Sequence, residues 1–183
     1  MRTARRAQII EAAIDTIAAE GLARASFARI ARTAGLSSTG LISYHFAGKQ
    51  ELMDEVVRLV AAEFAAFVEE RRDAEAGPAA ELRAFIAANV EFASKHRTRL
   101  LAALDVARAE RKPAFQVDLP GLAGLLRAGQ RHGEFRFFDV DVMAIAVQSV
   151  LDGVLNRLAA DQDADLGAYT EELATLFELA TCG

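Results

Sequence analysis

A glycine between two short helical patterns is the feature that most restricts how this chain folds, and it lies within residues 26–52. Apolar residues at helical spacing follow the favourable N-cap Ser26 and predict a helix from Phe27 to about Ala34. Gly35 is placed to end that helix, because glycine adopts the left-handed conformation without strain. The pattern therefore predicts a short helix that stops at a tight turn.

A second short helix is predicted from Thr39 to Phe46, with Leu41, Ile42 and Phe46 on its apolar side. The tandem serines at 37–38 supply its candidate N-cap. Two short helices joined by a glycine turn form a helix-turn-helix, whose second helix is shaped to enter the major groove of DNA.

The outward face of the second helix carries hydroxyls, a phenol and an imidazole, which suit phosphate oxygens or base edges. The candidate DNA-binding residues are Ser38, Thr39, Gly40, Ser43, Tyr44, His45 and Lys49. Gly40 is unexpected, since glycine costs about 0.5–1 kcal/mol relative to alanine inside a helix. Two interpretations of Gly40 are open: it permits a close approach to DNA, or it relieves a steric clash with the first helix.

Lys49 is predicted to begin the next helix, where the helix dipole disfavours a cation by about 0.3–1 kcal/mol. A cation beside free amide donors forms a phosphate site. We therefore interpret Lys49 as a phosphate contact, with a solvated surface lysine as the alternative.

These residues resemble the headpiece of the TetR family of transcriptional regulators. The matching positions are Ile30-Ala31, Ala34-Gly35-Leu36-Ser37, Tyr44-His45-Phe46, Lys49 and Leu52. The resemblance implies that the second motif helix reads DNA and that Lys49 holds a backbone phosphate. The tandem serines at 37–38 make this chain one residue longer here than the commonest family spacing, which predicts a longer turn or a later helix start.

The whole chain is predicted to be all-α, because no alternating strand pattern occurs. About nine helices are expected, over 3–19, 27–34, 39–46, 49–72, 79–95, 98–110, 120–132, 139–160 and 166–181. We expect an N-terminal three-helix, helix-turn-helix DNA-binding domain over 1–48 and a C-terminal helical domain for ligand binding and dimerisation over 49–183.

Charge is distributed unevenly along the chain, although its net value is only −5. Residues 1–50 hold seven Lys/Arg and three Asp/Glu, which gives +4, and residues 51–183 therefore carry −9. This asymmetry favours one end that faces DNA and one end that DNA repels.

The helix expected over 139–160 is apolar on more than one side, which predicts burial on more than one side. The resemblance implies that it pairs with the last helix and their symmetry mates, so that two headpieces reach half-sites about 34 Å apart on a palindrome. The candidate dimer-interface residues are Val150, Val154, Leu158, Leu173, Leu176 and Phe177. A central core helix is the alternative interpretation.

The resemblance also implies a small effector in the second domain. The candidate ligand-binding residues are Phe64, Phe67, Phe85, Asn89, Phe92, Leu104, Phe115, Met143, Val147 and Gln148. Leu101 and Gln116 are further candidates. Apolar residues at this spacing also occur in ordinary cores, which is the competing interpretation of the set.

Enzymatic and metal-binding functions find no support in the sequence. None of the three histidines has a second His or Cys at metal-ligand spacing, and no nucleophile elbow or phosphate-binding glycine loop is present. The single cysteine, Cys182, has no partner in the chain. We expect no enzyme activity, no cofactor and no metal, and, without a signal-peptide core or membrane span, a cytoplasmic location.

The sequence is interpreted as a homodimeric repressor that a small-molecule effector releases from a palindromic operator. In this hypothesis the long helix that follows Lys49 carries the signal. The alternative is a constitutive DNA-binding dimer whose second domain is a protein-interaction module without a small ligand. A helical module that never binds DNA is the third possibility.

Overall fold

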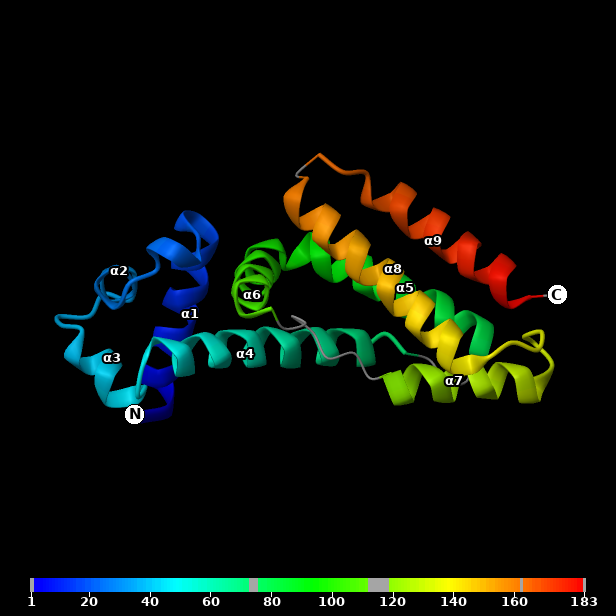
Figure 1. The fold of residues 1–183 in the computed structure, drawn as a ribbon, viewed down its shortest axis with the longest axis horizontal. Coiled ribbons are helices and arrows are strands. Elements are labelled where there is room, and N and C mark those ends of the chain that lie inside the picture. The colour runs from blue at the N-terminus through cyan, green and yellow to red at the C-terminus, as the bar shows by residue number, and fades with distance from the viewer. Residues whose placement is uncertain (1, 73–75, 112–118, 162, 183) are drawn as a thin grey trace. The chain divides into compact units, whose positions relative to one another are not determined.

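The computed structural model describes residues 2–72, 76–111, 119–161 and 163–182, and within these ranges the chain is helical and contains no strand (Figure 1). The helices are α1 (Arg2–Glu20), the 3-10 turn η1 (Leu22–Arg24), α2 (Phe27–Thr33), α3 (Gly40–His45), α4 (Lys49–Glu69), α5 (Pro78–Lys95), α6 (Arg97–Glu110), α7 (Leu119–His132), α8 (Val140–Ala160) and α9 (Leu166–Thr181). The predicted all-α fold is confirmed, and most of the helix ends lie within a residue or two of their expected positions.

Helices α2, α3 and α4 end earlier than predicted, α2 by the single residue Ala34. Phe46 lies outside α3, because its backbone is extended with φ −136° and ψ 129°. The helix expected over 49–72 stops at Glu69, and hydrogen-bonded turns carry the chain through Arg72. The 3-10 turn η1, which follows Gly21 at φ +81°, was not predicted.

The chain divides into two compact units. Unit 1 comprises residues 1–63 and 96–116, and unit 2 comprises residues 64–95 and 117–183. Helix α4 therefore contributes to both units. The functional boundary expected between residues 48 and 49 stays a prediction, because compactness does not define function.

Unit 1 is built on α1, which packs against α2, η1 and α6. The predicted isoleucine stripe of α1 is buried: Ile10, Ile14 and Ile17 are at most 5% exposed. Ile30 from α2 joins them in the core and is fully buried. Apolar burial of this kind fixes the short helices of the unit, which lack the length to be stable alone.

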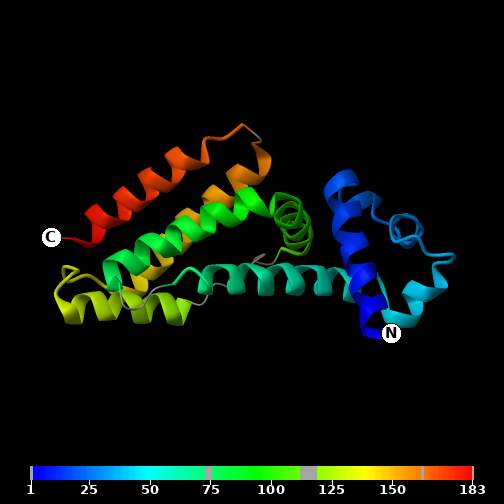
Figure 2. The same cartoon turned by 180° about the vertical axis from the view of Figure 1, so that it is seen from behind.

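Unit 2 is a stack of helices in which α5 packs against α7, α8 and α9. Helices α5 and α8 run in the same direction and α9 runs back beside them (Figures 1 and 2). Asp139 and Asp165 begin α8 and α9 as N-caps, since each carboxylate accepts a hydrogen bond of 3.0 Å from the backbone N–H three residues on.

Helix α8 is not buried on more than one side within the single chain. Ala144, Val147 and Leu151 form its buried side, whereas Val142 and Ile145 are 64% and 57% exposed. The predicted second buried side is therefore an exposed apolar surface in this chain.

We predict opposite effects for two alanine substitutions in α7. A Cβ at Gly129 would overlap the buried Phe135 ring, so Gly129→Ala is expected to lower the free energy of unfolding by about 1–3 kcal/mol. A Cβ at Gly124 would have no atom within 4 Å. Gly124→Ala is therefore expected to raise the free energy of unfolding by about 0.5–1 kcal/mol. Urea denaturation measures both, and equal effects would contradict the packing of Phe135 against Gly129.

Candidate nucleic-acid interface

Helix α2 and the turn after it have the predicted glycine geometry. Ser26 caps α2, since its hydroxyl accepts a hydrogen bond of 3.3 Å from the N–H of Arg29. Gly35 has φ +63°, and the N–H of Leu36 donates to the carbonyl of Ala31 at 2.8 Å. A glycine in the left-handed conformation thus ends the right-handed helix α2, and the chain turns toward α3.

Helix α3 begins later than the tandem serines suggested. Thr39 occupies the cap position and makes no side-chain capping bond, so the predicted N-cap at Ser37 or Ser38 is wrong. The extra residue lengthens the turn, and the first residue of the helix is Gly40.

Two apolar residues anchor α3 to the rest of unit 1. Ile42 is fully buried and Phe46 is 1% exposed. Leu41, predicted on the same apolar side, is 37% exposed and lies at its edge. With only Ile42 and Phe46 directed inward, most of the helix circumference remains outside the core.

The outward face of α3 presents the predicted polar residues to solvent. Thr39, Ser43 and Tyr44 are exposed, Tyr44 by 68%, and His45 is half-buried. The rings of Tyr44 and His45 meet edge to face, with centroids 5.2 Å apart. This contact between neighbours limits the orientations that the two rings adopt on the surface.

Gly40 does not relieve a clash with α2. A Cβ at Gly40 would meet only the hydroxyl of Ser38, at an ordinary contact distance of 3.5 Å, and no atom of α2. That interpretation is wrong, and a close approach of DNA stays a prediction.

Lys49 begins α4 and is exposed. Its ammonium donates to the carbonyl of Leu22 at 3.1 Å, which holds the side chain beside η1 and leaves two of its three protons for other acceptors. Glu51 lies in the first turn of α4 and accepts a hydrogen bond of 2.7 Å from the N–H of Ala47. Its negative charge at the helix N-terminus offsets the unfavourable position of the lysine.

Arg6 joins α1 to α4. Its guanidinium lies 3.1 Å from the carboxylate of Glu51 and 2.9 Å from that of Glu55, and 4.5 Å above the ring of Phe46. The pKa of Glu55 lies below its ordinary value, first because Arg58 donates to it and also because Arg6 does. Arg6, which carries part of the N-terminal positive charge, thus links α1 to the first turns of α4 and to Phe46.

A second charged cluster joins three helices of unit 1. Arg99 on α6 donates to Glu11 on α1 at 2.7 and 2.9 Å, and to Glu63 on α4 at 2.5 Å. These hydrogen bonds raise the pKa of Arg99, and the bond from Arg99 lowers the pKa of Glu11. Asp105, also on α6, accepts a hydrogen bond of 2.7 Å from the N–H of Leu22. Sequence reasoning missed both contacts, because the partners of Arg99 and Asp105 lie far away in the chain.

The predicted ligand-binding residues do not all lie in the same unit. Phe64, Phe67 and Phe92 come together in unit 2, where the ring of Phe92 meets those of Phe64 and Phe67 edge to face at 5.1 and 5.5 Å. Phe85, Asn89, Met143, Val147 and Gln148 belong to the same unit. Leu101 and Leu104 belong to unit 1, and Phe115 and Gln116 lie outside the described residues.

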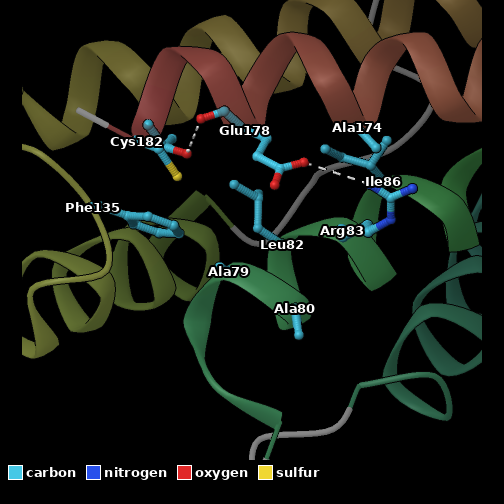
Figure 3. Close-up of a pocket in the computed structure, with 10 residues that line it drawn as sticks. Ala79, Ala80, Leu82, Arg83, Ile86, Phe135, Ala174, Glu178 and Cys182 are labelled. Atoms are coloured by element: carbon cyan, nitrogen blue, oxygen red, sulfur yellow. Dashed lines mark hydrogen bonds and ion pairs between the residues drawn. The ribbon is translucent and has the colours of Figure 1, made fainter.

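A separate cavity of about 180 Å³ lies in unit 2 between the start of α5, Phe135 and the end of α9 (Figure 3). Arg83 and Glu178 face each other across it at 3.6 Å, and Arg83 also binds Glu171 at 2.7 Å. The main charged groups of this cavity therefore satisfy one another. None of the predicted ligand-binding residues lines it.

The predicted dimer-interface residues separate into two groups. Leu173 and Phe177 are 7% and 4% exposed and form part of the core of unit 2. Val150 and Val154 are half-buried, and Leu176 is 50% exposed. The side chain of Leu158 lies outside the described residues.

Metal sites and membrane-spanning helices are both absent from the described residues. They contain no group of three or more His, Cys, Asp or Glu side chains placed to hold a metal ion. In the same ranges, no helix combines the length and the apolar character that crossing a membrane requires.

Known proteins match this chain at its N-terminal end and in its fold. Residues 9–56 match the family model described as bacterial regulatory proteins, tetR family. The HTH-type transcriptional regulator BetI of Paraburkholderia phytofirmans is 41% identical over 92 residues, which are 50% of this chain and 47% of that protein. BetI 1 of Chromohalobacter salexigens is 36% identical over 99 residues, or 54% of this chain and 48% of its own length. The chain thus spans about half the length of the curated relatives it matches.

Solved structures share the fold over nearly the whole chain. A bacterial regulatory protein in the tetR family from Rhodococcus RHA1 has a TM-score of 0.76 at 18% identity, and covers 97% of both chains. The ketosteroid transcriptional regulator KstR2 of Mycobacterium tuberculosis has a TM-score of 0.74 at 22% identity, and covers 98% of this chain and 95% of its own. These likenesses concern the fold alone.

A helix-turn-helix formed by α2 and α3, together with a second helical unit, is the architecture of a two-part helix-turn-helix protein. Residues 9–56 carry the N-terminal domain of the tetR family of bacterial regulatory proteins, and the chain as a whole shares the fold of that family's solved structures. Its relatives are described as transcriptional regulators, which agrees with the expectation that it is not an enzyme.

We predict that Arg99→Gln weakens unit 1 and changes its response to acid. Both carboxylates are partly exposed to water, so the expected loss in unfolding free energy near neutral pH is about 1–2 kcal/mol. Since the pKa of Glu11 is lower folded than unfolded, its contribution is present above its ordinary pKa of 4.5 and is lost as the pH falls. In the variant the pKa of Glu11 rises toward 4.5 and this part of the acid dependence disappears.

Denaturation across acid pH and NMR titration of Glu11 measure these effects. Arg58→Gln is the matched control, because Arg58 is 66% exposed and is expected to contribute less than about 0.5 kcal/mol. An unchanged pKa of Glu11 in Arg99→Gln would contradict the network.

Proposed function

We propose that this chain is a DNA-binding transcriptional regulator that reads its operator with α3 and holds a backbone phosphate with Lys49. The observation that carries the proposal is the exposed polar face of α3 on a helix whose inner side is anchored by Ile42 and Phe46. A short, anchored helix with hydroxyl, phenol and imidazole groups outward matches the requirements of a major-groove reader.

Charge supports the same assignment. Residues 1–50 carry a net charge of +4 within a chain of −5, so attraction to DNA is concentrated at the end that contains α3. We propose that a protein with this role acts in the cytoplasm.

We further propose that two copies associate through the exposed apolar surface of α8 and α9. This surface is formed by Val142, Ile145, Leu176 and Leu179, which are 50–75% exposed in the single chain. Exposed apolar side chains of this size on two helices that both pack against α5 are unusual unless a partner covers them. A two-fold dimer presents two headpieces, which fits a palindromic operator.

In the proposed mechanism a small effector bound in unit 2 releases the operator, so that the protein acts as a repressor. Helix α4 contributes residues to both units, and Arg99 and Asp105 attach α6 to α1 and η1. Coupling of about 1–3 kcal/mol between effector and DNA is sufficient for a switch. The alternative is a constitutive DNA-binding dimer whose exposed α8 and α9 surface binds another protein; its DNA affinity would not respond to any small molecule.

We predict that Lys49→Ala weakens DNA binding on every sequence. Fragments selected from random DNA by the purified protein provide the operator for the measurement. Loss of one phosphate contact is expected to reduce the slope of log affinity against log salt by about 0.9. Lys95→Ala is the control, since Lys95 lies on α5 and pairs with Glu91. An unchanged slope in Lys49→Ala would remove Lys49 from the interface.

We also predict that Ile145→Glu converts a dimer into a monomer. A charge at the centre of an apolar interface leaves a carboxylate without water or a partner, which opposes association. Analytical ultracentrifugation measures the state, and Ser94→Glu is the control, because Ser94 is an exposed residue of α5 outside the proposed surface. A dimer of undiminished stability in Ile145→Glu would place the interface elsewhere.

A further inference from the structure

Two amide oxygens in unit 2 are buried without a hydrogen-bond partner among the described residues. They are Oδ1 of Asn89 on α5 and Oε1 of Gln148 on α8. Asn89 is 1% exposed, so bulk water does not reach it. Buried amide oxygens almost always accept a hydrogen bond, and each exception calls for an explanation.

The orientation of both amides is fixed by their nitrogens. The amide of Asn89 donates to the carbonyl of Phe85 at 2.8 Å, and the amide of Gln148 donates to Asp152 at 2.6 Å. Rotating either amide by half a turn would place its oxygen against another oxygen and lose that bond. The groups left over are therefore two acceptors, and only a donor can satisfy them.

The two acceptors lie on neighbouring helices among apolar side chains. Helices α5 and α8 pack against each other and run in the same direction (Figures 1 and 2). Asn89 lies in the interior of α5 and Gln148 in the interior of α8. Phe92 follows Asn89 by one helical turn and contacts Phe64 and Phe67. Val147, beside Gln148, is fully buried. An apolar wall with a few acceptors is the composition of a small-molecule site.

Asp152 adds negative charge to the same helix. Burial raises the pKa of its carboxyl group, and the bond from Gln148 partly opposes this effect. A ligand with a positive charge would favour the ionised carboxylate, whereas a neutral hydroxyl would not depend on it.

We propose that unit 2 binds a small apolar molecule that carries hydrogen-bond donors, hydroxyl or ammonium, and that the oxygens of Asn89 and Gln148 accept from it. This inference rests on the proposed effector function and names the class of its ligand. Ligands of the same size that carry only acceptors, such as ketones, leave both oxygens unsatisfied and bind more weakly.

Three aromatic probes of similar size test the inference: styrene glycol carries two hydroxyls, phenylethylamine carries an ammonium group, and acetophenone carries only an acceptor. Their affinities for the full chain are measured by NMR titration, with the side-chain amide signals of Asn89 and Gln148 as the local readout. We expect at least one donor probe to shift these signals and to bind at least about tenfold more tightly than acetophenone. The donor probe that binds more tightly distinguishes a hydroxyl ligand from a cationic one.

Substitutions test whether the two oxygens cause the preference. The double variant Asn89→Leu with Gln148→Met is expected to lose the tenfold preference, while Asn156→Leu, an exposed change on α8, keeps it. The single variant Gln148→Met removes only one of the two acceptors, so it is expected to reduce the preference for the donor probes and tests the proposal if the double variant does not fold.

The inference is overturned if neither donor probe binds, if acetophenone binds as tightly, or if the preference survives in the double variant. Operator binding is measured separately with each probe. A donor probe that binds at Asn89 without releasing DNA would overturn effector release and keep the ligand assignment. Release of DNA by acetophenone alone would keep effector release and overturn the ligand assignment.

Discussion

The arrangement of unit 1 depends on burying Ile42 and Phe46. Helix α3 spans only Gly40–His45, which is too short to be helical in water without tertiary packing. Burial of these two side chains therefore determines both that α3 exists and which of its sides faces outward. The polar surface formed by Ser43, Tyr44 and His45 follows from this constraint, because the remaining positions of so short a helix have no other direction to face.

Much of the fold was predictable, because helix positions follow from local patterns of apolar spacing, caps and glycines. Ser26 and Asp139 begin helices because their side chains cap the first turn. Gly35 ends a helix because it adopts the left-handed conformation without strain. The start of α3 was misplaced because two adjacent serines offered equal caps and the structure uses neither. Leu41 was assigned inward because a six-residue helix gives too few positions to fix its apolar direction.

The candidate site was predictable where its residues are consecutive and unpredictable where they are not. The outward face of α3 could be predicted from consecutive residues. In contrast, Arg99 and Glu11 are 88 residues apart in the sequence, and Arg6 and Glu51 are 45 residues apart. Charged side chains occur at every helical surface, so spacing alone does not reveal which of them pair. The amide oxygens of Asn89 and Gln148 were likewise recognisable as polar, but their lack of partners depends on the packing of α5 and α8.

The hydrogen bond from the ammonium of Lys49 to the carbonyl of Leu22 reduces the entropy that this side chain can lose when it binds a ligand. A lysine side chain that is free in solution loses up to about 2 kcal/mol of rotamer freedom when a ligand immobilises it. Here the carbonyl of Leu22 already restrains the ammonium, and the N–H of the same residue is held by Asp105 on α6. In the proposed interface, part of the ordering of the Lys49 side chain is thus completed during folding, and loosening α6 is expected to weaken DNA binding by restoring disorder to this side chain, without moving α3.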